Sequence, residues 1–268
     1  MRILLPPSEG KAAGGDHGPV DARALVAPKL AAVRKRVLTA VARTARGDGA
    51  AAAAAFKLPP AVVAESLAAN REAAKSPTMP ALDRYTGVVY AALDPATLSA
   101  AGRAAAEESA LVFSGLFGVV AGGDLVPAYR VPVASVLPEL GALTPVWRAA
   151  LREVMPVLVG KGFAVDLRST DYAGMWAPTG PLRHQVLPVR LLTKRPSGPP
   201  RVVSYPSKHG KGLLARELVE RLGKGAAVSS ADDVGEAAAA LGWDVETRRT
   251  QGSVPALDVV MPPWVPVS

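Results

Sequence analysis

The segment Arg201-Val-Val-Ser-Tyr-Pro-Ser-Lys-His-Gly-Lys-Gly-Leu-Leu-Ala-Arg216 decides the fold class of this chain. Its β-branched start predicts a strand that ends at Tyr205, and a basic turn with two glycines follows. Leu214, Leu218 and Leu222 then recur at four-residue spacing, which predicts a helix. A strand, a turn and a helix in succession are typical of an α/β protein.

The same alternation continues along the chain without internal repeats. Strands are predicted over residues 2–5, 163–167, 186–192, 243–247 and 257–261. Helices are predicted over residues 22–46 (with a break near Pro28), 61–75, 83–93, 95–108, 144–155 and 231–240. We therefore expect one α/β domain over residues 1–268, with a mixed β-sheet flanked by helices.

Positive charge is concentrated around the opening segment. From Arg183 to Arg216 there are eight Arg or Lys residues and no Asp or Glu, and the whole chain carries a net charge of +8. This balance favours acidic partners, namely nucleic acid, nucleotides or an anionic membrane. A membrane is the weakest of the three, because no helix pairs a strong basic face with Trp or Phe opposite.

Composition excludes several kinds of site. The chain has no cysteine, which excludes disulfides, thiol catalysis and iron–sulfur clusters. Its three histidines are far apart in the sequence, so we expect no metal site, and we expect no cofactor. The sequence shows no signal peptide and no apolar run of transmembrane length, and we expect a cytoplasmic protein.

The block Ser114-Gly-Leu-Phe-Gly118 has the form of a helix–hairpin–helix turn. In such a turn Gly115 and Gly118 let backbone N–H groups approach a DNA phosphate, and such a contact reads no sequence. The alternative is a tight turn after a strand, in which the glycines only permit positive φ angles.

A second candidate site is the loop Pro7-Ser-Glu-Gly-Lys11, which follows the first predicted strand. Functional loops of α/β proteins usually lie at such strand ends. Glu9 and Lys11 are candidates for an acid/base pair or an ion pair there. The alternative is a solvated charged loop.

The basic turn itself is a candidate phosphate clamp made of Lys208, Lys211 and Arg216. The turn directs both lysines toward a helix N-terminus, where free N–H groups favour an anion, and Ser204 lies at the end of the predicted strand. Gly212 either lets a ligand approach the backbone or permits close packing within the protein. The alternative for the whole turn is a solvated cationic helix start.

Three further pairs place an aromatic ring beside a charged residue: Arg84-Tyr85, Tyr129-Arg130 and Asp171-Tyr172. A tyrosine next to an arginine can stack on a base while the arginine binds its phosphate. A half-buried tyrosine with a hydrogen-bonded hydroxyl is the alternative for each.

Taken together, these blocks resemble the YaaA family, the bacterial peroxide stress proteins. The matching blocks are Ile3–Lys11, Tyr85–Gly87, Ser114–Gly118, Asp124, Pro127–Arg130, Asp171-Tyr172 and the 201–216 segment, in family order from residue 2 to about residue 260. In one departure, Val131-Pro-Val-Ala134 stands where the family often has Leu-Glu-Met-Gly, so a family glutamate is missing.

The resemblance implies a basic cleft, a DNA-binding helix–hairpin–helix element and protection against hydrogen peroxide linked to limiting free intracellular iron. It also raises Lys11 above Glu9 as a site residue, and it brings the aromatic and charged pairs into one polar cleft. The predicted function is sequence-independent binding of duplex DNA. The alternative is a lyase or glycosylase acting on a nucleotide-like ligand, with Glu9, Lys11 and Asp171 as catalytic residues beside Lys208.

Overall fold

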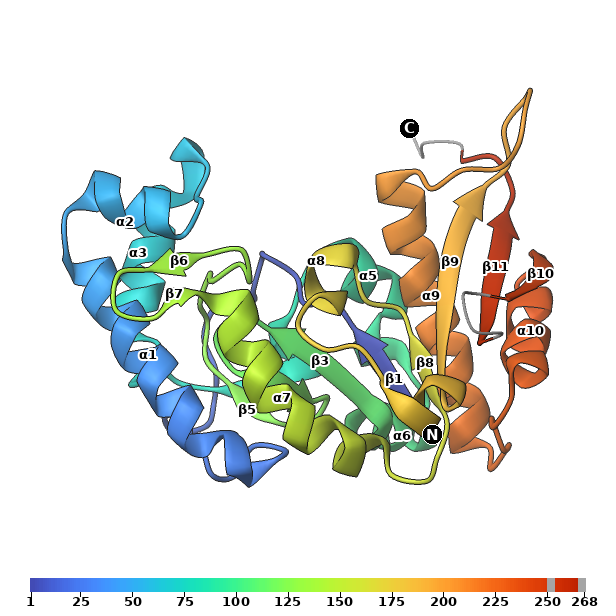
Figure 1. Ribbon diagram of the computed structural model, residues 1–268, viewed down its shortest axis with the longest axis horizontal. Helices are drawn as coiled ribbons and strands as arrows, with labels where there is room; N and C mark the ends of the chain where they lie inside the picture. Colours follow the sequence, from blue (N-terminus) through green and yellow to red (C-terminus); the bar gives the residue numbers. More distant parts are fainter. Residues whose placement is uncertain (250–253, 265–268) are drawn as a thin grey trace.

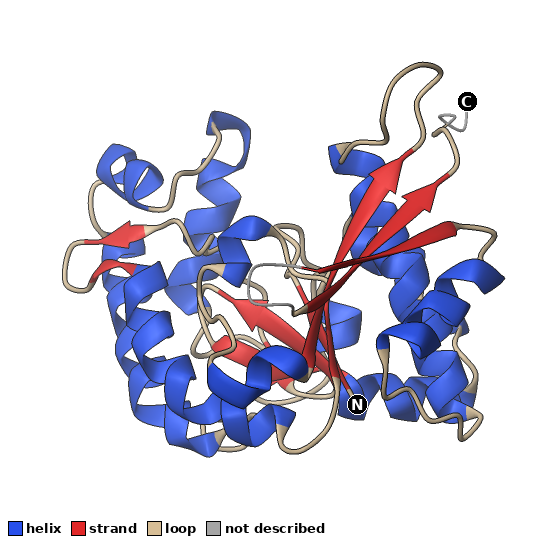
Figure 2. Ribbon diagram, turned by 45° about the vertical axis from the view of Figure 1, so that its right-hand side comes forward, coloured by secondary structure: helices blue, strands red, loops and turns tan. Residues whose placement is uncertain are grey.

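Five parallel strands form the centre of a seven-stranded twisted sheet (Figure 1, Figure 2). The computed structural model describes residues 1–249 and 254–264. The parallel strands are β1 (Arg2–Leu5), β3 (Ala110–Ser114), β8 (Ala164–Asp166), β9 (Val186–Thr193) and β11 (Pro255–Met261). The antiparallel strands β4 (Gly118–Ala121) and β10 (Asp244–Arg249) form the two edges, and the order is β10-β11-β9-β8-β1-β3-β4. The predicted mixed sheet is confirmed.

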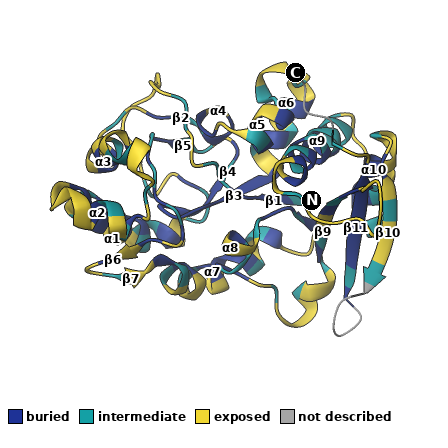
Figure 3. Cartoon of the chain, turned by 90° about the horizontal axis from the view of Figure 1, so that it is seen from above, coloured by how far each residue is buried: buried dark blue, intermediate teal, exposed yellow. Residues whose placement is uncertain are grey.

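Helices cover both faces of this sheet (Figure 3). One face carries α5 (Val88–Leu93), α6 (Ala100–Ser109), α9 (Ser204–Gly223) and α10 (Ala231–Ala240), and the other carries α7 (Leu143–Val159) and α8 (Thr170–Ala173). The central strands are enclosed on both sides, and every residue of β3 is buried. A continuous run of apolar residues in β3 is what a parallel strand covered on both faces requires.

A separate layer of helices lies at the β3–β4 side of the molecule (Figure 1). It contains α1 (Ala31–Arg46), α2 (Gly49–Ala55) and α3 (Val63–Glu72), preceded by the 3₁₀ turn Pro28–Leu30. Short elements connect this layer to the sheet: β2 (Met79–Pro80) pairs with β5 (Leu125–Val126), α4 spans Ala81–Arg84, and β6 (Val136–Leu137) pairs with β7 (Gly141–Ala142).

Arg34 of α1 joins the helical layer to the β3–β4 hairpin. Its side chain is fully buried, and its guanidinium donates to backbone carbonyls of both parts. The acceptors are the carbonyls of Ala22, Val26, Ala27, Phe117 and Val119. Burial lowers the pKa of Arg34 to about 10, while nearby Asp124 acts to raise it. A buried cation with this many acceptors holds two segments in a fixed relative position.

The strand order creates a switch point beside β1. The chain leaves β1 toward β3 on one side, and it later returns to β8 on the other side. The loops that follow β1 and β8 therefore diverge at the carboxyl edge of the sheet. In open α/β sheets, ligands bind in the crevice that such diverging loops leave.

The strand predicted over residues 201–205 and the basic turn predicted after it are both wrong, because α9 spans Ser204–Gly223 and includes Lys208 and Lys211. Residues 201–205 are not a strand: Arg201 makes only an isolated bridge with Thr193, and α9 already begins at Ser204. The position beside β9 is taken by β11 instead, so the sheet has no place for this segment. Ser204 and Tyr205 therefore belong to the first turn of a helix.

The block Ser114–Gly118 is not a helix–hairpin–helix turn. It joins β3 to β4 in an antiparallel β-hairpin, in which Ser114 pairs with Gly118. All five residues are buried, so the turn lies inside the protein. The alternative of a tight turn after a strand is the correct one.

Within residues 1–249 and 254–264, no single helix is long and apolar enough to cross a membrane. The helical segments Gly49–Ala55 and Pro60–Glu72 together have sufficient length and apolar composition, but the pair is bent by 112°.

Candidate functional site at the carboxyl edge of the sheet

The structure brings together residues from three places in the sequence at the switch point. The loop after β1 supplies Glu9 and Lys11, and β3 ends at Ser114. The segment after β8 supplies Arg168 and Tyr172. Because β1, β3 and β8 are parallel neighbours, all of these residues leave the sheet at the same edge.

The Lys11 amine is held between backbone carbonyls and aromatic rings. Its Nζ donates to the carbonyl of Ser8 at 2.9 Å and to that of Glu9 at 3.4 Å. The same Nζ lies 4.1 Å from the ring centroid of Tyr129 and 5.2 Å from that of Tyr85. Ring faces and carbonyl oxygens both attract a cation.

Burial acts against this cation and lowers the pKa of Lys11 to about 7. The Glu9 carboxylate acts to raise that pKa, whereas the guanidinium groups of Arg130 and Arg84 act to lower it further. The ammonium and the neutral amine of Lys11 are therefore close in free energy at neutral pH. A lysine in this state is able to act as a nucleophile or to exchange a proton.

Beneath Lys11 lies a cluster of three buried hydroxyl groups. Tyr129 Oη is 2.6 Å from Tyr85 Oη and 2.6 Å from Ser114 Oγ. Ser114 Oγ also accepts hydrogen bonds from the N–H groups of Leu116 and Phe117. Since these two bonds occupy both lone pairs of Ser114, its proton points to Tyr129, and that of Tyr129 points to Tyr85. The Tyr85 proton is then left for a further acceptor.

Burial keeps these phenols neutral. It raises the pKa of Tyr85 to about 12 and holds the pKa of Tyr129 well above its ordinary value. The pKa of Tyr172 is also raised, first by burial and then by the Glu9 carboxylate. At neutral pH the cluster is a set of hydrogen-bond donors and acceptors without charge of its own.

Glu9 pairs with Arg130 rather than with Lys11. Arg130 Nε is 3.8 Å from Glu9 Oε2, and both side chains are partly exposed. The buried Asn70 side chain fixes the backbone of Arg130 by one donated and one accepted hydrogen bond, each 2.8 Å long. The predicted Glu9–Lys11 couple is therefore split into an ion pair and a separate amine.

A second group of charges adjoins the first. Arg168 forms a two-pronged ion pair with Asp166, with nitrogen–oxygen distances of 2.9 and 2.6 Å, and lies 4.3 Å from the ring centroid of Phe113. Lys211 of α9 donates to the Arg168 carbonyl at 2.9 Å. Burial lowers the pKa of Lys211 to about 8, with Asp166 opposing this shift and Lys208 adding to it.

Several predicted site residues serve the fold instead. Arg84 is fully buried and donates to the carbonyls of Ala12, Gly14, Pro77 and Val126. Arg216 donates to the carbonyls of Leu93, Asp94 and Thr97, which ties α9 to the end of α5. A Cβ atom on Gly212 would lie 2.1 Å from the Val89 carbonyl, so this glycine permits close packing of α9 on α5. We no longer assign these three residues to ligand contact.

The two glycines of the β-hairpin are also packing residues. A Cβ atom on Gly115 would lie 2.1 Å from the carbonyl oxygen of Val131. Gly118 has a φ of +76°, and a Cβ atom there would lie 2.6 Å from the Trp147 ring. Both glycines lie inside the protein, packed against other parts of the chain.

The remaining predicted site residues lie near the carboxyl edge of the sheet and differ in how far they are exposed to solvent. Asp171 is exposed on the short helix α8, whereas its neighbour Tyr172 is buried. Ser204 and Lys208 are exposed at the start of α9, where no side chain caps the first N–H groups. The surface at the start of α9 is therefore open to an anion.

Comparison with known proteins places the chain in a family. Residues 1–237 match the family model described as peroxide stress protein YaaA. The chain belongs to the YaaA family of peroxide stress proteins. A UPF0246 protein of Streptomyces coelicolor is 40% identical over 264 residues, which are 97% of this chain and 98% of that protein. A UPF0246 protein of Corynebacterium efficiens is 36% identical over 224 residues, 81% of this chain and 84% of that protein.

In this YaaA-family protein, sequence reasoning missed the ion pair of Asp166 and Arg168. The signal was present, because Asp166 lies near the end of the strand predicted over residues 163–167 and Arg168 directly follows that strand at the functional edge. Tyr129 fits the alternative to base stacking, a tyrosine with a hydrogen-bonded hydroxyl, and it is the buried centre of the hydroxyl cluster. No local pattern shows that three hydroxyl groups from distant segments meet.

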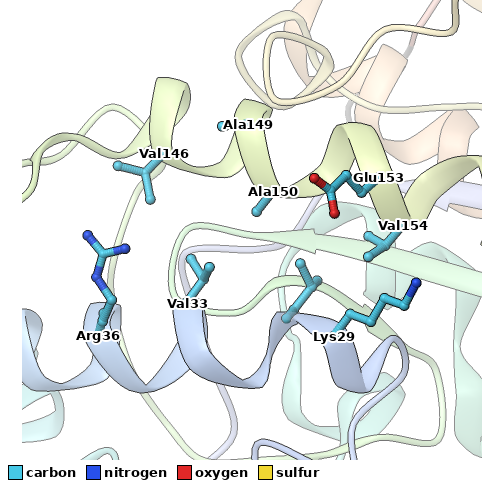
Figure 4. Close-up of a pocket in the computed structure, with 9 residues that line it drawn as sticks. Lys29, Val33, Arg36, Val146, Ala149, Ala150, Glu153 and Val154 are labelled. Atoms are coloured by element: carbon cyan, nitrogen blue, oxygen red, sulfur yellow. The ribbon is translucent and has the colours of Figure 1, made fainter.

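Other hollows of this YaaA-family protein lie away from the switch point. Figure 4 shows a groove of about 420 Å³ between α1 and α7, lined mainly by aliphatic side chains such as Val33, Val146 and Val154. Lys29, Arg36 and Glu153 also line it (Figure 4). Within residues 1–249 and 254–264, no group of three His, Asp or Glu side chains is arranged to hold a metal ion.

Proposed function

We propose that this YaaA-family protein is a cytoplasmic protein that binds duplex DNA without sequence preference during peroxide stress. The observation that carries the proposal is the exposed run of cations that leads from β9 into α9. Arg195, Arg201 and Lys208 are all exposed there, in a window of sequence without a single acid, whereas the exposed Lys194 pairs with Asp244 of β10. Phosphate groups at regular spacing are the natural counter-charge for such a surface.

Other arginines of the chain contrast with this run. Arg34, Arg84, Arg168 and Arg216 have partners inside the protein, as described above, and Arg103 pairs with Asp83 and Glu107. Among the described residues, Lys208 makes no hydrogen bond or ion pair, and its charge acts on Lys211. Charge that serves no internal contact is available to an external anion.

The protection would act at DNA. Peroxide damages DNA through reactions driven by free iron, and a protein that covers the phosphate backbone limits access to it. In this proposal the family's link to intracellular iron lies in the DNA damage that free iron drives. The protein itself needs to bind no metal.

The salt dependence of binding tests the proposal. The logarithm of the affinity for a duplex should fall linearly with the logarithm of salt concentration, and each neutralised phosphate should contribute about −0.9 to the slope. Lys208→Ala should flatten that slope by about one. Lys211→Ala should flatten it less, because its amine is already bound to the Arg168 carbonyl.

Lys161→Ala is the matched control. Lys161 is exposed and precedes β8, at the opposite edge of the sheet, so its removal lowers the net charge equally without touching the proposed surface. If Lys161→Ala flattened the slope as much as Lys208→Ala, the binding would be a diffuse attraction that depends only on net charge. No mobility shift of any duplex at low salt would overturn the proposal.

The second candidate function is a lyase or glycosylase acting on a nucleotide-like ligand. It is favoured by one observation, the Lys11 amine with its pKa lowered to about 7 above a buried hydroxyl cluster. The neutral amine would attack the C1′ aldehyde of an abasic deoxyribose and release water to form an imine. Borohydride would then reduce the imine to a stable secondary amine.

Trapping with abasic-site DNA and borohydride tests this second function. We expect a covalent adduct in the unmodified protein and in Lys208→Ala, and none in Lys11→Ala. A carboxylate mechanism would give no adduct, yet Glu9→Gln would abolish release of a base. If single-stranded, duplex and mononucleotide substrates give neither adduct nor released base, binding alone remains.

A further inference from the structure

The start of α9 carries an exposed aromatic cluster next to the cations. Tyr205, in the first turn of α9, has 52% of its surface exposed. Its ring centroid is 5.1 Å from that of Trp264, which follows β11, and the two rings meet at 61°. His209 contacts Trp264 in the same way, at 5.2 Å and 66°. The segment after β11 thus returns to the start of α9 (Figure 1).

The contacts orient the Tyr205 ring without burying it. Tyr205 and His209 are four residues apart on a helix and share one face, and Trp264 packs edge-on against both. Tyr205 nevertheless keeps half its surface in water, and the neighbouring Val202 is 55% exposed. An exposed, oriented aromatic surface marks a place of contact with a partner.

The charges around the cluster select the partner. Lys208 lies on the same turns of α9, and Arg195 and Arg201 lie on the segment that leads into it. A flat ring beside the Lys208 cation matches a base with its flanking phosphate. In a duplex the faces of the bases are covered by stacking, so a protein ring reaches only an unpaired base.

We propose that Tyr205, oriented by Trp264, is a stacking site for an unpaired nucleobase of single-stranded DNA, with Lys208 at the adjoining phosphate. The proposal rests on the proposed DNA-binding function and extends it to single-stranded or locally opened DNA. Trp264 lies outside the residues 1–237 that match the family model. The stacking site thus combines a family segment with a residue beyond it.

Binding of a short single-stranded oligonucleotide tests the site. Tyr205→Ala should weaken binding roughly tenfold, because stacking on an aromatic side chain dominates such contacts, and Tyr205→Phe should retain most of the affinity. The affinity for a duplex of the same sequence should change less than about twofold in either variant. Since Tyr205 is exposed, both variants should unfold at the same temperature as the unmodified protein.

An oligonucleotide with the same phosphates and no bases separates stacking from charge. The affinity of the unmodified protein for this base-free oligonucleotide should be as low as the affinity of Tyr205→Ala for the normal strand. The DNA should also quench tryptophan fluorescence, and Trp264→Phe should remove most of the quenching, since Trp147, Trp176 and Trp243 are at most 8% exposed.

The outcomes separate the two proposals. Equal binding of single strands by Tyr205→Ala and the unmodified protein, with duplex binding intact, overturns the stacking site alone. Failure to bind either form of DNA overturns the proposed function as well. Tyr205-dependent retention on anionic phosphatidylserine vesicles, without binding of single strands, would assign the cluster to a membrane surface.

Discussion

Lys11 occupies a position in which two opposing effects nearly balance. Burial favours its neutral amine, whereas two carbonyls and the Tyr129 ring favour the ammonium. The balance makes the protonation of Lys11 a measurable property of the folded state. It also makes the stability of the protein depend on pH in a definite direction.

We predict that Lys11→Met has a larger free energy of unfolding than the unmodified protein at pH 7, and that this difference decreases as the pH rises. The pKa of Lys11 is about 7 when folded and 10.5 as a free side chain. Between these values the unfolded chain binds more protons, so the free energy of unfolding of the unmodified protein rises with pH. Met does not titrate, and we expect its relative advantage to shrink by ~3 kcal/mol from about pH 7 to about pH 9.5.

Urea unfolding of both proteins across that pH range measures the difference. Lys211 also titrates near its pKa of about 8, but it is present in both proteins and cancels. A constant difference between the two proteins would mean that Lys11 keeps an ordinary pKa when folded.

Ser114 is the residue on which the hydroxyl cluster depends. We predict that Ser114→Ala lowers the free energy of unfolding by about 2–4 kcal/mol, because it leaves the buried N–H groups of Leu116 and Phe117 without an acceptor. Ser135 is the matched control, since it is equally buried and donates one hydrogen bond to Pro132. Ser135→Ala should cost about 1 kcal/mol. Equal losses, measured by urea unfolding, would contradict the argument.

At the scale of elements, Gly212 in α9 permits the helix to pack closely on α5. We predict that Gly212→Ala destabilises the protein by at least ~2 kcal/mol, because the added methyl group meets the Val89 carbonyl where α9 crosses α5. Gly235 in α10 is the control, since its nearest neighbour would be Val245 Cγ1 at an ordinary 3.5 Å. Gly235→Ala should stabilise by up to about 1 kcal/mol, and thermal unfolding would show the opposite signs.

The elements that the sequence predicted well are those with local signals. The helix predicted over residues 231–240 is confirmed as α10, which Ser230 and Asp233 close with a capping box and which Gly242 follows with a φ of +76°. α7 was predicted from Thr144, yet it begins at Leu143 with Ala142 as its N-cap. Such one-residue errors arise because a helix start depends on surrounding contacts as well as on capping residues.

The errors arose where tertiary structure overrides local preference. Val202 and Val203 favour a strand, but β11 occupies the edge of β9 that this strand would need. The glycines of residues 114–118 suit several kinds of turn, and only the pairing of β3 with β4 selects the hairpin. The parallel strands allowed the prediction that loop residues of the site gather at one edge of the sheet. The sequence did not show that Arg84 supports the fold from inside, because its four carbonyl partners come from distant segments.

On the scale of the whole molecule, Arg34 connects the helical layer to the sheet. We predict that Arg34→Met lowers the free energy of unfolding by about 3–5 kcal/mol, because the carbonyls that it serves lose a buried charged donor. Hydrogen exchange should accelerate first in residues 22–27 and in α1, while β1 and β8 stay protected. Arg36→Met, at an exposed position of the same helix, should change stability by less than about 0.5 kcal/mol. Uniform acceleration of exchange would show that the layer and the sheet open together.

The interior position of β11 governs how the sheet is completed during synthesis. β9 is made before α9, α10 and β10, but its neighbour β11 is made after all of them. β10 does not cover β9, because it pairs only with the far side of β11. Nascent chains that stop short of residues 255–261 therefore leave a long parallel edge unpaired, and such an edge is a template for association with other chains. Ribosomes that stall in this interval would release a product that depends on chaperones.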